Sequence, residues 1–437
     1  MTRQTDQIEI EIPCLNRPLE ATVVIPGSKS ITNRALLLAA LADGPSVLEN
    51  ALFSEDTHWF STCLQQLGIP VISQPEAARF TVTGRGGSIP APQADLFVGN
   101  AGTAARFITA LAALGQGRYR LDGIPRMRER PMGELLAALQ AAGAQVSFEA
   151  QPGCMPYTLH SRGFRGGAIS LAASQTSQQV SALLMIAPYA RQDTVIEIVD
   201  DLVSSAYVGI TCRVMADFGV EVRPEANARF VVKAGQRYQA RRYPIEPDAS
   251  NASYFLAAAA VTGGRVRVEH LSKNSCQGDA QFIEVLAAMD CRITAGDHYM
   301  EVEGPAQLQG LEVDMNNMSD LVQTLAAIAP FANSPVTIRN VEHIRYKETE
   351  RIKAVVTELR RLGAPVEEFA DGLKIYPGPL QPAAIETYND HRMAMAFAVT
   401  GLKTPGLVIK NPACTRKTFP DFFTRFFQMT GMERPGE

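Results

Sequence analysis

The chain has 437 residues, a length that suggests two to three domains. Hydrophobic residues make up 46% of the chain and charged residues 20%, which is typical of a soluble globular protein. The formal net charge of −4 excludes a general electrostatic affinity for nucleic acid or membranes, so any basic patch must be local.

The cysteines and the N-terminal stretch favour a cytoplasmic protein. The seven cysteines are scattered, their number is odd, and no pair has C-x-x-C spacing, which argues against a disulfide framework. Glu9 and Glu11 lie near the start of the chain, where neither a signal peptide nor an acid-poor transit peptide is indicated. No apolar run approaches the ~20 residues that cross a bilayer.

A helix that ends on a small residue and leads into a strand recurs along the whole chain. The expected end residues, spaced 68 to 76 residues apart, are Gly68, Gly143, Gly219, Asp290, Gly363 and Gly431. Glycine is common just past a helix because it adopts positive φ without a steric penalty, and Asp290 is the expected exception. One or two copies of this helix–glycine–strand pattern would be ordinary in any α/β protein, whereas six in register predict a repeat architecture.

A second series of helices runs in step with the first and is rich in alanine and leucine. These helices are expected around Ala35, Phe107, Val180, Ser253, Leu321 and Arg392. They are apolar on nearly every side, which predicts helices buried in the protein interior. Six α/β units of about 72 residues each, with β-rich stretches between the helices, therefore account for almost the whole chain.

Each helix of the second series begins at a polar cluster. The clusters are Ser28-Lys29-Ser30, Asn100-Ala101-Gly102-Thr103, Thr176-Ser177-Gln178, Asp248-Ala249-Ser250, Ser319-Asp320 and Asn389-Asp390-His391-Arg392. Taken singly, such residues are ordinary N-caps. Capping does not explain the nearby cations, which are Lys29, Arg34, Arg106, Arg130, Lys347, Arg351, Arg392 and Lys417. Cations at helix starts, without a net positive charge, predict a small anionic ligand.

Three of these regions carry specific expectations. Lys29 and Ser30 are expected just before a helix, with Arg34 on the same face as Ser30, and Gly27 is expected to let backbone approach a ligand. Lys347 to Arg351 could form either part of a site or an exposed helix with salt bridges. Asp390 could likewise be a solvated cap. G-x-x-x-x-G-K-[ST] is absent, so ATP hydrolysis is not expected.

Seven motifs occur in one order from residue 26 to residue 421: PGSKS-x-x-NRALLLAAL, GNAGTA-x-R, ERP-x-G, LVS-x-x-Y, YKETER, YNDHRMAM and CT-x-KTFPD. In these motifs the sequence resembles the 5-enolpyruvylshikimate-3-phosphate synthases over its whole length. The resemblance implies a two-domain inside-out α/β barrel of six βαβαββ repeats, three per domain, with the active site in the interdomain cleft. It implies domain I at 1–27 plus 246–437, domain II at 28–245, and hinge crossovers near 25–27 and 244–246.

The resemblance also implies the reaction. The enolpyruvyl group of phosphoenolpyruvate would pass to the 5-hydroxyl of shikimate 3-phosphate by addition and elimination through a tetrahedral intermediate, in the shikimate pathway of aromatic amino-acid biosynthesis. No metal or cofactor is expected. The expected partners are these two small-molecule substrates, with glyphosate as an inhibitor, and the expected state is a cytoplasmic monomer without nucleic-acid or membrane partners.

Site residues follow from the resemblance position by position. Asp320 resembles the general base, Glu348 the acid that protonates the methylene carbon, and Lys29 a third catalytic group. The implied shikimate 3-phosphate ligands are Lys29, Ser30, Arg34, Thr176, Ser177, Gln178, Ser204, Asp320, His343 and Lys347. The implied phosphoenolpyruvate ligands are Lys29, Gly102, Arg130, Gln178, Arg351, Arg392 and Lys417. Three positions depart from the family pattern, since His343 stands where Asn is frequent, Thr176 where Ser is, and Phe107 where Pro is.

Two alternatives remain open at this point. The sister enzyme that transfers enolpyruvyl to UDP-N-acetylglucosamine shares the repeats, but its GAKN start is replaced here by GSKS and its cysteine-bearing loop is not seen. A non-catalytic protein that binds anions between two domains would have no need for both Asp320 and Glu348. Activity with each acceptor separates the first alternative, and phosphate release separates the second.

Overall fold

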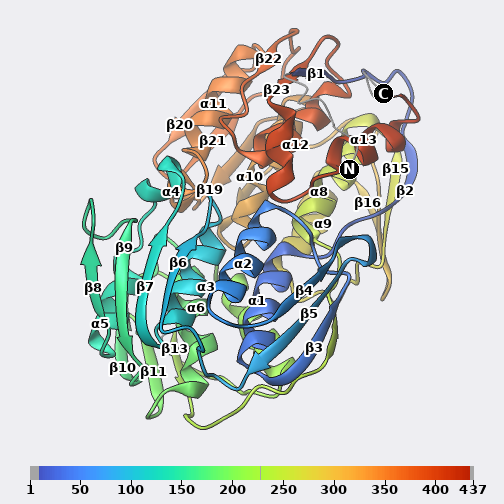
Figure 1. The fold of residues 1–437 in the computed structure, drawn as a ribbon. Helices are drawn as coiled ribbons and strands as arrows, with labels where there is room; N and C mark the ends of the chain where they lie inside the picture. Colours follow the sequence, from blue (N-terminus) through green and yellow to red (C-terminus); the bar gives the residue numbers. More distant parts are fainter. Residues whose placement is uncertain (1–8, 227, 434–437) are drawn as a thin grey trace. The chain divides into compact units, whose positions relative to one another are not determined.

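The computed structural model describes residues 9–226 and 228–433, and the domain limits expected at residues 1 and 437 fall outside them. Within the described residues the chain is α/β, with six small sheets that each lie beside helices (Figure 1). The chain divides into two compact units, which are Met1–Pro26 with Pro247–Glu437 (unit 1) and Gly27–Glu246 (unit 2).

Unit 2 holds three repeats, each with two parallel strands followed in the sheet by two antiparallel strands. Their sheet orders are β14-β3-β5-β4, β6-β7-β9-β8 and β10-β11-β13-β12. The first repeat contains α1 (Lys29–Leu41), β3 (Asp43–Glu49), α2 (Glu55–Gln66), β4 (Val71–Gln74), β5 (Arg79–Arg85) and β14 (Arg242–Pro244). The second contains β6 (Gln93–Phe97), α3 (Gly102–Ala112), β7 (Gln116–Asp122), α4 (Pro125–Glu129), α5 (Gly133–Ala141), β8 (Gln145–Phe148) and β9 (Tyr157–Arg162). The third contains β10 (Gly167–Leu171), α6 (Gln178–Ile186), β11 (Thr194–Ile198), α7 (Ser205–Asp217), β12 (Arg223–Glu225) and β13 (Arg229–Val232).

Unit 1 repeats this plan in two four-stranded sheets, β16-β17-β15-β2 and β18-β19-β21-β20, while its third sheet, β1-β23-β22, has three strands. Its first repeat contains β2 (Glu20–Val24), α8 (Ala249–Thr262), β15 (Arg265–Glu269), α9 (Phe282–Ala288), β16 (Arg292–Ala295) and β17 (Tyr299–Glu303). The second contains β18 (Glu312–Asp314), α10 (Val322–Ile328), β19 (Val336–Arg339), α11 (Arg351–Arg361), β20 (Val366–Phe369) and β21 (Gly372–Ile375). The third contains β22 (Ala384–Ile385), α12 (His391–Gly401), β23 (Val408–Lys410), α13 (Phe422–Thr430) and β1 (Glu9–Glu11).

Three strand pairings explain why unit 1 is discontinuous in sequence. The N-terminal strand β1 lies antiparallel to β23 near the end of the chain, with Ile10 opposite Ile409. Strand β2 then pairs in parallel with β15, which follows only after all of unit 2 (Figure 1). Strand β14 pairs in parallel with β3 and completes the first sheet of unit 2. The chain therefore crosses between the units once after β2 and once after β14.

The six expected helix ends share one backbone geometry. All six residues have φ between +70° and +109°, and Asp290, the exception in residue type, has φ +74°. At the end of α2, the N–H of Gly68 donates to the carbonyl of Gln65, and the N–H of Ile69 donates to the carbonyl of Leu64. The same two hydrogen bonds follow α5, α7, α9, α11 and α13. This is the Schellman motif, in which a left-handed residue satisfies the last carbonyls of a helix. The sixfold repeat predicted from these residues is confirmed.

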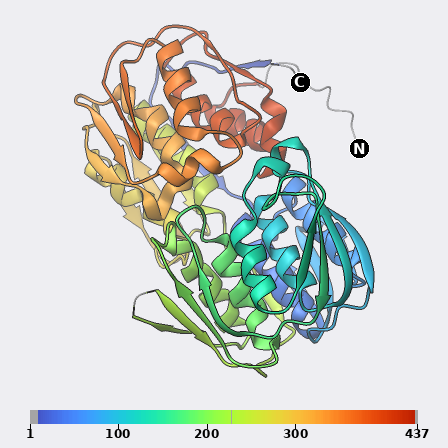
Figure 2. The ribbon, with the colours of Figure 1, turned by 90° about the vertical axis from the view of Figure 1, so that its left-hand side faces the viewer.

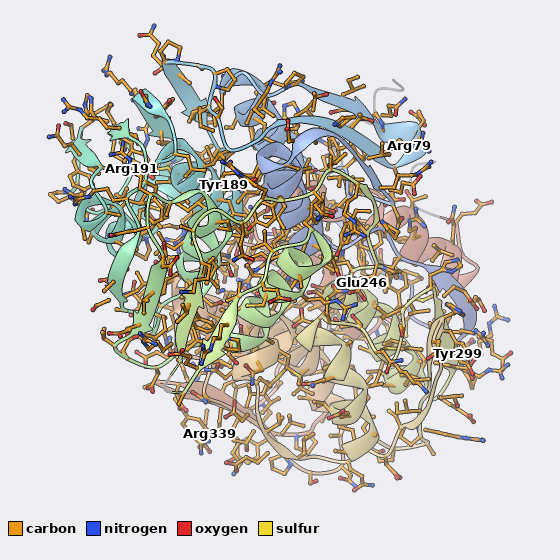
Figure 3. The ribbon with its side chains drawn as sticks, turned by 90° about the horizontal axis from the view of Figure 1, so that it is seen from below. Arg79, Tyr189, Arg191, Glu246, Tyr299 and Arg339 are labelled. Atoms are coloured by element: carbon orange, nitrogen blue, oxygen red, sulfur yellow. The ribbon has the colours of Figure 1, made fainter. Side chains whose placement is uncertain are left out.

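The alanine-rich helices form the interior of each unit, as their composition predicts. Every residue of α8 is buried, and α8, α10 and α12 pack against one another. In unit 2, α3 packs against both α1 and α6 (Figure 2). The sheets expose one face, and Arg79 on β5 and Arg339 on β19 lie on the outer surface of their units (Figure 3).

Two further observations concern the class of protein. All seven cysteines are free thiols. None of the helices within 9–226 and 228–433 combines the length and the apolar character that a membrane crossing requires.

Candidate functional site

The predicted site residues form two groups, one in each unit. Unit 2 carries Lys29, Ser30, Arg34, Gly102, Arg130, Thr176, Ser177, Gln178 and Ser204. Unit 1 carries Asp320, His343, Lys347, Glu348, Arg351, Arg392 and Lys417. Most residues of each group lie on loops, 3₁₀ turns and first helical turns of their unit.

In unit 2, helix α1 begins two residues earlier than the sequence suggests. Ser28 is the N-cap, and its side chain accepts a hydrogen bond from the N–H of Ile31, so Lys29 and Ser30 are the first two helical residues. The Lys29 ammonium lies 3.6 Å from the carboxylate of Asp56, which is itself buried. The expectation that these two residues precede the helix is wrong, because Ser28 caps it.

Gly27 is required for a reason other than the one expected. A Cβ atom at this position would lie 1.7 Å from the carbonyl oxygen of Asn50. Backbone of the same unit therefore occupies the space that a side chain would need. The close approach expected for a ligand is made by the protein itself.

Arg34 connects helix α1 to α3 and α7 of unit 2. It is almost completely buried, and it donates from Nε to Oγ1 of Thr211 at 2.7 Å and from Nη2 to the carbonyl of Tyr207 at 2.9 Å. Nη1 donates to the carbonyl of Ser30 at 2.8 Å. Its guanidinium also lies over the ring of Phe107, 5.5 Å from the centroid. These contacts fix the first turn of α1 against α7 and α3.

Arg130 lies flat against the start of α3. Nη1 of this buried arginine donates to the carbonyl of Asn100 at 3.2 Å. A Cβ atom built on Gly102, the first residue of α3, would lie 2.3 Å from Nη2 of Arg130. Arg106 donates to the carbonyl of Gly102 at 2.9 Å from one turn further along the helix. Gly102 is thus the residue that leaves room for the guanidinium.

The loops before α6 and α7 hold the remaining predicted residues of unit 2. Gln178 is the first residue of α6, and its N–H donates to Oγ1 of Thr176 at 3.2 Å. The hydroxyl of Ser177 donates to the carbonyl of Ser204 at 3.2 Å. Ser204 precedes α7 with φ +52°. The two loops are therefore joined directly at their serines.

Arg351 is the centre of the group in unit 1. Its guanidinium is 1% exposed and lies 2.8 Å from Glu348, 3.0 Å from Asp320 and 2.8 Å from Asp390. Burial opposes the charged form, but the carboxylates of Asp390, Glu348 and Asp320 raise the pKa of Arg351 above its ordinary value. Arg351 is consequently a permanent buried cation, and the alternative of an exposed helix with salt bridges is wrong.

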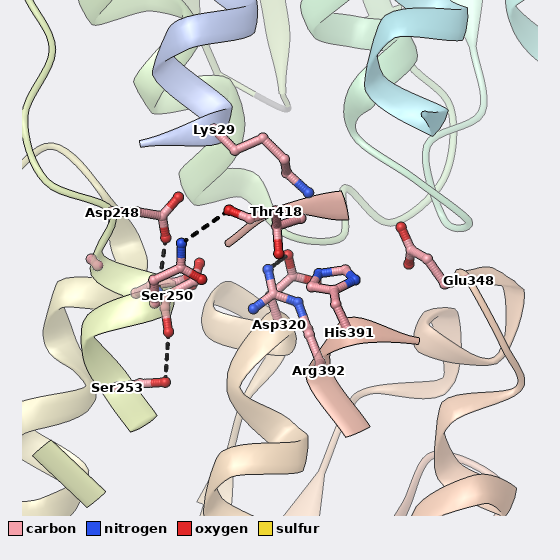
Figure 4. A network of polar contacts seen from close by, with 12 residues as sticks. Lys29, Asp248, Ser250, Ser253, Asp320, Glu348, His391, Arg392 and Thr418 are labelled. Atoms are coloured by element: carbon pink, nitrogen blue, oxygen red, sulfur yellow. Dashed lines mark hydrogen bonds and ion pairs between the residues drawn. The ribbon is translucent and has the colours of Figure 1, made fainter. Parts of the chain in front are cut away.

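Asp320 connects Arg351 to a second buried arginine. Arg351 contacts Oδ1 of Asp320, and Nη2 of Arg392 lies 2.6 Å from Oδ2 of the same carboxylate (Figure 4). Asp320 lies in the 3₁₀ turn Asn316–Leu321, so it precedes helix α10 instead of capping it. Lys417 approaches Glu348 at 3.9 Å. Three carboxylates and three cations are thus packed together in unit 1. They are Asp320, Glu348 and Asp390 with Arg351, Arg392 and Lys417.

Asp390 has a larger role than its sequence position suggested. It caps α12 by accepting from the N–H of Arg392 at 2.9 Å, and it also holds Arg351. Because Asp390 is fully buried, the alternative of a solvated cap is wrong. Its motif YNDHR was visible in the sequence, whereas nothing near Asp56 marked it as the partner of Lys29.

His343 and Lys347 flank this cluster at the turn before α11. His343 lies in the 3₁₀ turn Glu342–Tyr346 and is 3% exposed. Burial, followed by the charge of Lys347, lowers the pKa of His343 to about 3. The imidazole is therefore neutral near pH 7, where it can exchange hydrogen bonds with a hydroxyl but cannot supply positive charge.

A further acidic group adjoins Asp320. Asp279 lies in the 3₁₀ turn Gly278–Gln281, which packs against the turn that carries Asp320, and it accepts a hydrogen bond from Ser250. Burial and the charge of Asp320 raise the pKa of Asp279 to about 7. No sequence pattern distinguishes this residue, because a lone Asp at a helix start resembles any other cap.

Comparison with known proteins adds to this geometry. Residues 15–426 match the family model described as EPSP synthase (3-phosphoshikimate 1-carboxyvinyltransferase). The chain is 70% identical over 422 residues to the 3-phosphoshikimate 1-carboxyvinyltransferase of Trichormus variabilis, which covers 97% of this chain and 99% of that one. It is 46% identical over 416 residues to the protein of the same name from Yersinia pestis, covering 94% and 96%. The solved EPSP synthase of Acinetobacter baumannii superposes with a TM-score of 0.82 at 23% identity, covers 98% of this chain and 99% of its own, and shares the fold.

Proposed function

The chain belongs to the EPSP synthase family, and from this we propose how its residues carry out the reaction. It is a transferase that moves the enolpyruvyl group of phosphoenolpyruvate to the 5-hydroxyl of shikimate 3-phosphate, with release of phosphate. The reaction belongs to the shikimate pathway of aromatic amino-acid biosynthesis. An alcohol adds across the enol double bond, and phosphate is then expelled from a tetrahedral intermediate.

Asp320 is the general base in this proposal. Its two oxygens face Arg351 and Arg392, and these paired cations favour the carboxylate, which is the form that accepts a proton. Asp320 takes the proton of the 5-hydroxyl while the oxygen attacks C2 of phosphoenolpyruvate. The double pairing of Asp320 with two buried arginines is the observation that carries the proposal, because it places a base beside fixed charge for an anionic substrate.

Glu348 is the acid that protonates the methylene carbon. It now shares Arg351 with Asp320 and lies near Lys417. When the carboxylate and phosphate of phosphoenolpyruvate engage these cations, the added negative charge favours the protonated form of Glu348. In the elimination step Glu348 takes back a proton from the methyl group, and the proton on Asp320 is available to the departing phosphate. Lys29 is assigned a supporting role near the reacting atoms.

The binding residues are assigned by ligand. For shikimate 3-phosphate they are Lys29, Ser30, Arg34, Thr176, Ser177, Gln178, Ser204, Asp320, His343 and Lys347. For phosphoenolpyruvate they are Lys29, Gly102, Arg130, Gln178, Arg351, Arg392 and Lys417. The first turns of α1 and α6 support the phosphate assignment, since the positive end of the helix dipole there attracts anions. Neutral His343 suits a sugar-like hydroxyl.

The finer expectations extend this proposal. Domain I at 1–27 plus 246–437 and domain II at 28–245 would move about crossovers near 25–27 and 244–246. Glyphosate would compete with phosphoenolpyruvate at the loop that contains Gly102. The protein would act as a cytoplasmic monomer without a metal or cofactor.

A phosphate-release assay tests the proposal. Purified protein is mixed with phosphoenolpyruvate and either shikimate 3-phosphate or UDP-N-acetylglucosamine. Release of phosphate with the first acceptor alone is expected. Release with the second acceptor would assign the chain to the sister reaction, and release with neither would contradict an enzymatic role.

A further inference from the structure

Glu358 is a fully buried carboxylate on helix α11, seven residues after Arg351 and therefore on the same face of the helix. Its Oε1 accepts from the hydroxyl of Tyr388 at 2.7 Å, and its Oε2 accepts from the backbone N–H of Glu386 at 3.1 Å. Arg361 supplies the balancing charge at 3.0 Å. A buried carboxylate is stable only with such partners. Through these two hydrogen bonds, Glu358 holds the segment that contains residues 386 and 388 in place.

This segment has an unfavourable backbone conformation. It connects β22 to α12, and Tyr388 and Asn389 in succession have φ +53° and +55°. Positive φ is disfavoured for residues other than glycine, more for tyrosine than for asparagine. Such a conformation persists only where surrounding contacts impose it. Besides the two bonds to Glu358, the side chain of Asn411 donates to Asn389 at 3.3 Å.

The residue that follows is Asp390, which links the segment to the proposed phosphoenolpyruvate ligands. Asp390 holds Nε of Arg351 at 2.8 Å and caps α12 through the N–H of Arg392. Helix α11 thus contacts the 386–390 segment twice, through Arg351 at one end and through Glu358 two turns later. Loss of the second contact would let the left-handed segment relax and shift Asp390.

We propose that Glu358 is a positioning residue for phosphoenolpyruvate binding, which acts by holding Tyr388 and the backbone of Glu386 so that Asp390 orients Arg351 and Arg392. This inference rests on the proposed function, because it requires those two arginines to bind phosphoenolpyruvate. Burial and Glu358 raise the pKa of Tyr388 to about 12, so its hydroxyl remains a donor throughout the working pH range.

The test begins with Tyr388→Phe, which removes one hydroxyl and leaves the charge of Glu358 in place. The expected result is a roughly tenfold rise in KM for phosphoenolpyruvate, the effect of losing one hydrogen bond to a charged group. KM for shikimate 3-phosphate should stay within about twofold. Tyr376→Phe is the matched control, because Tyr376 donates to Glu367 in an exposed pair of the same kind. It should leave both KM values unchanged.

Glu358→Gln is the second variant, and it places an amide N–H where Glu358 now accepts. It should raise KM for phosphoenolpyruvate at least as much as Tyr388→Phe, with faster amide hydrogen exchange at 386–392. If Glu358→Gln does not fold, Tyr388→Phe decides alone. A lower Tm with unchanged KM for phosphoenolpyruvate in Tyr388→Phe would reduce Glu358 to a structural residue and overturn the proposal.

Arg392→Lys, measured in the same series, separates this inference from the function on which it rests. A raised KM for phosphoenolpyruvate in Arg392→Lys, without one in Tyr388→Phe, rejects only the positioning role. An unchanged KM in Arg392→Lys rejects the ligand assignment instead. A raised KM for phosphoenolpyruvate in Tyr388→Phe, together with an unchanged KM in Arg392→Lys, would also show that Glu358 does not act through Asp390.

Discussion

Arg130 occupies the space in which a side chain at residue 102 would stand. A Cβ atom on Gly102 would lie 2.3 Å from Nη2 of Arg130 and 2.6 Å from its central guanidinium carbon. Real Cβ contacts of this length do not occur, so any larger residue must displace the guanidinium. The glycine at the start of α3 and the arginine after α4 therefore act as one element of the proposed phosphoenolpyruvate site.

Gly102→Ala should weaken phosphoenolpyruvate binding because it moves Arg130. Loss of one charge-assisted contact corresponds to a rise in KM of roughly ten- to a hundredfold. The inhibition constant for glyphosate should rise by a larger factor, since the added methyl also enters the space of the bulkier inhibitor. Gly209→Ala on α7 is the control, because a Cβ there meets nothing within 4 Å. Inhibition curves at fixed phosphoenolpyruvate would contradict this account if Gly102→Ala matched the parent.

Asp320→Asn should abolish most turnover while the acceptor still binds. The amide keeps the shape of the carboxylate but cannot accept the hydroxyl proton, and loss of a general base typically lowers the rate by about 10²–10⁴-fold. Asp421→Asn is the matched control, since Asp421 pairs with Arg425 on the surface. Steady-state rates and calorimetric titration with shikimate 3-phosphate provide the measurement. Near-parental turnover in Asp320→Asn would remove this residue from the mechanism.

Phe107→Leu should affect binding of shikimate 3-phosphate through Arg34. Phe107 is the sixth residue of α3, fully buried, and its ring supports the Arg34 guanidinium. A cation–π contact of about 1 kcal/mol corresponds to a KM change of roughly fivefold. Phe80→Leu removes an equally buried ring that stacks on Phe53 instead of an arginine. Both variants should be less stable, and only Phe107→Leu should change KM for shikimate 3-phosphate. Equal KM values in the two would refute the link to Arg34.

His343 should make the fold less stable as the pH falls. Its pKa is about 3 in the folded protein and near the ordinary 6.5 when unfolded, so between these values the unfolded chain binds more protons. Stability should therefore be retained above about pH 6.5 and decline toward pH 3, by up to about 1.4 kcal/mol per pH unit.

His343→Asn removes this contribution, and its urea midpoint should vary less between pH 7.5 and pH 5 than that of the parent. Asp279, whose pKa is raised to about 7, changes the stability with pH in the opposite direction. Its stabilising contribution is present below about pH 4 and is lost as the pH rises through 7. The difference between parent and variant isolates His343 from Asp279. The exposed His298→Asn is the control, and an identical pH slope in parent and His343→Asn would show that burial does not keep His343 neutral.

The sequence by itself determined the repeat architecture, because the signals for it are local. A Schellman end is decided within six consecutive residues, so Gly68 and its counterparts were recognisable without knowledge of the fold. The apolar sides of α8 and its relatives likewise predicted burial. The motifs also indicated the family and which acidic, basic and hydroxyl side chains the site would contain.

Tertiary structure alone decided which of those residues meet. Asp320 and Arg392 are 72 positions apart, and Arg34 and Thr211 are 177 apart, so no periodicity in the sequence joins them. The approach of Asn50 to Gly27, and the contact of Asp390 with Arg351 of the preceding repeat, were likewise not visible in the sequence. Sequence patterns report the free energy of local conformation, whereas ion pairs and close approaches depend on distances that only the packed chain establishes.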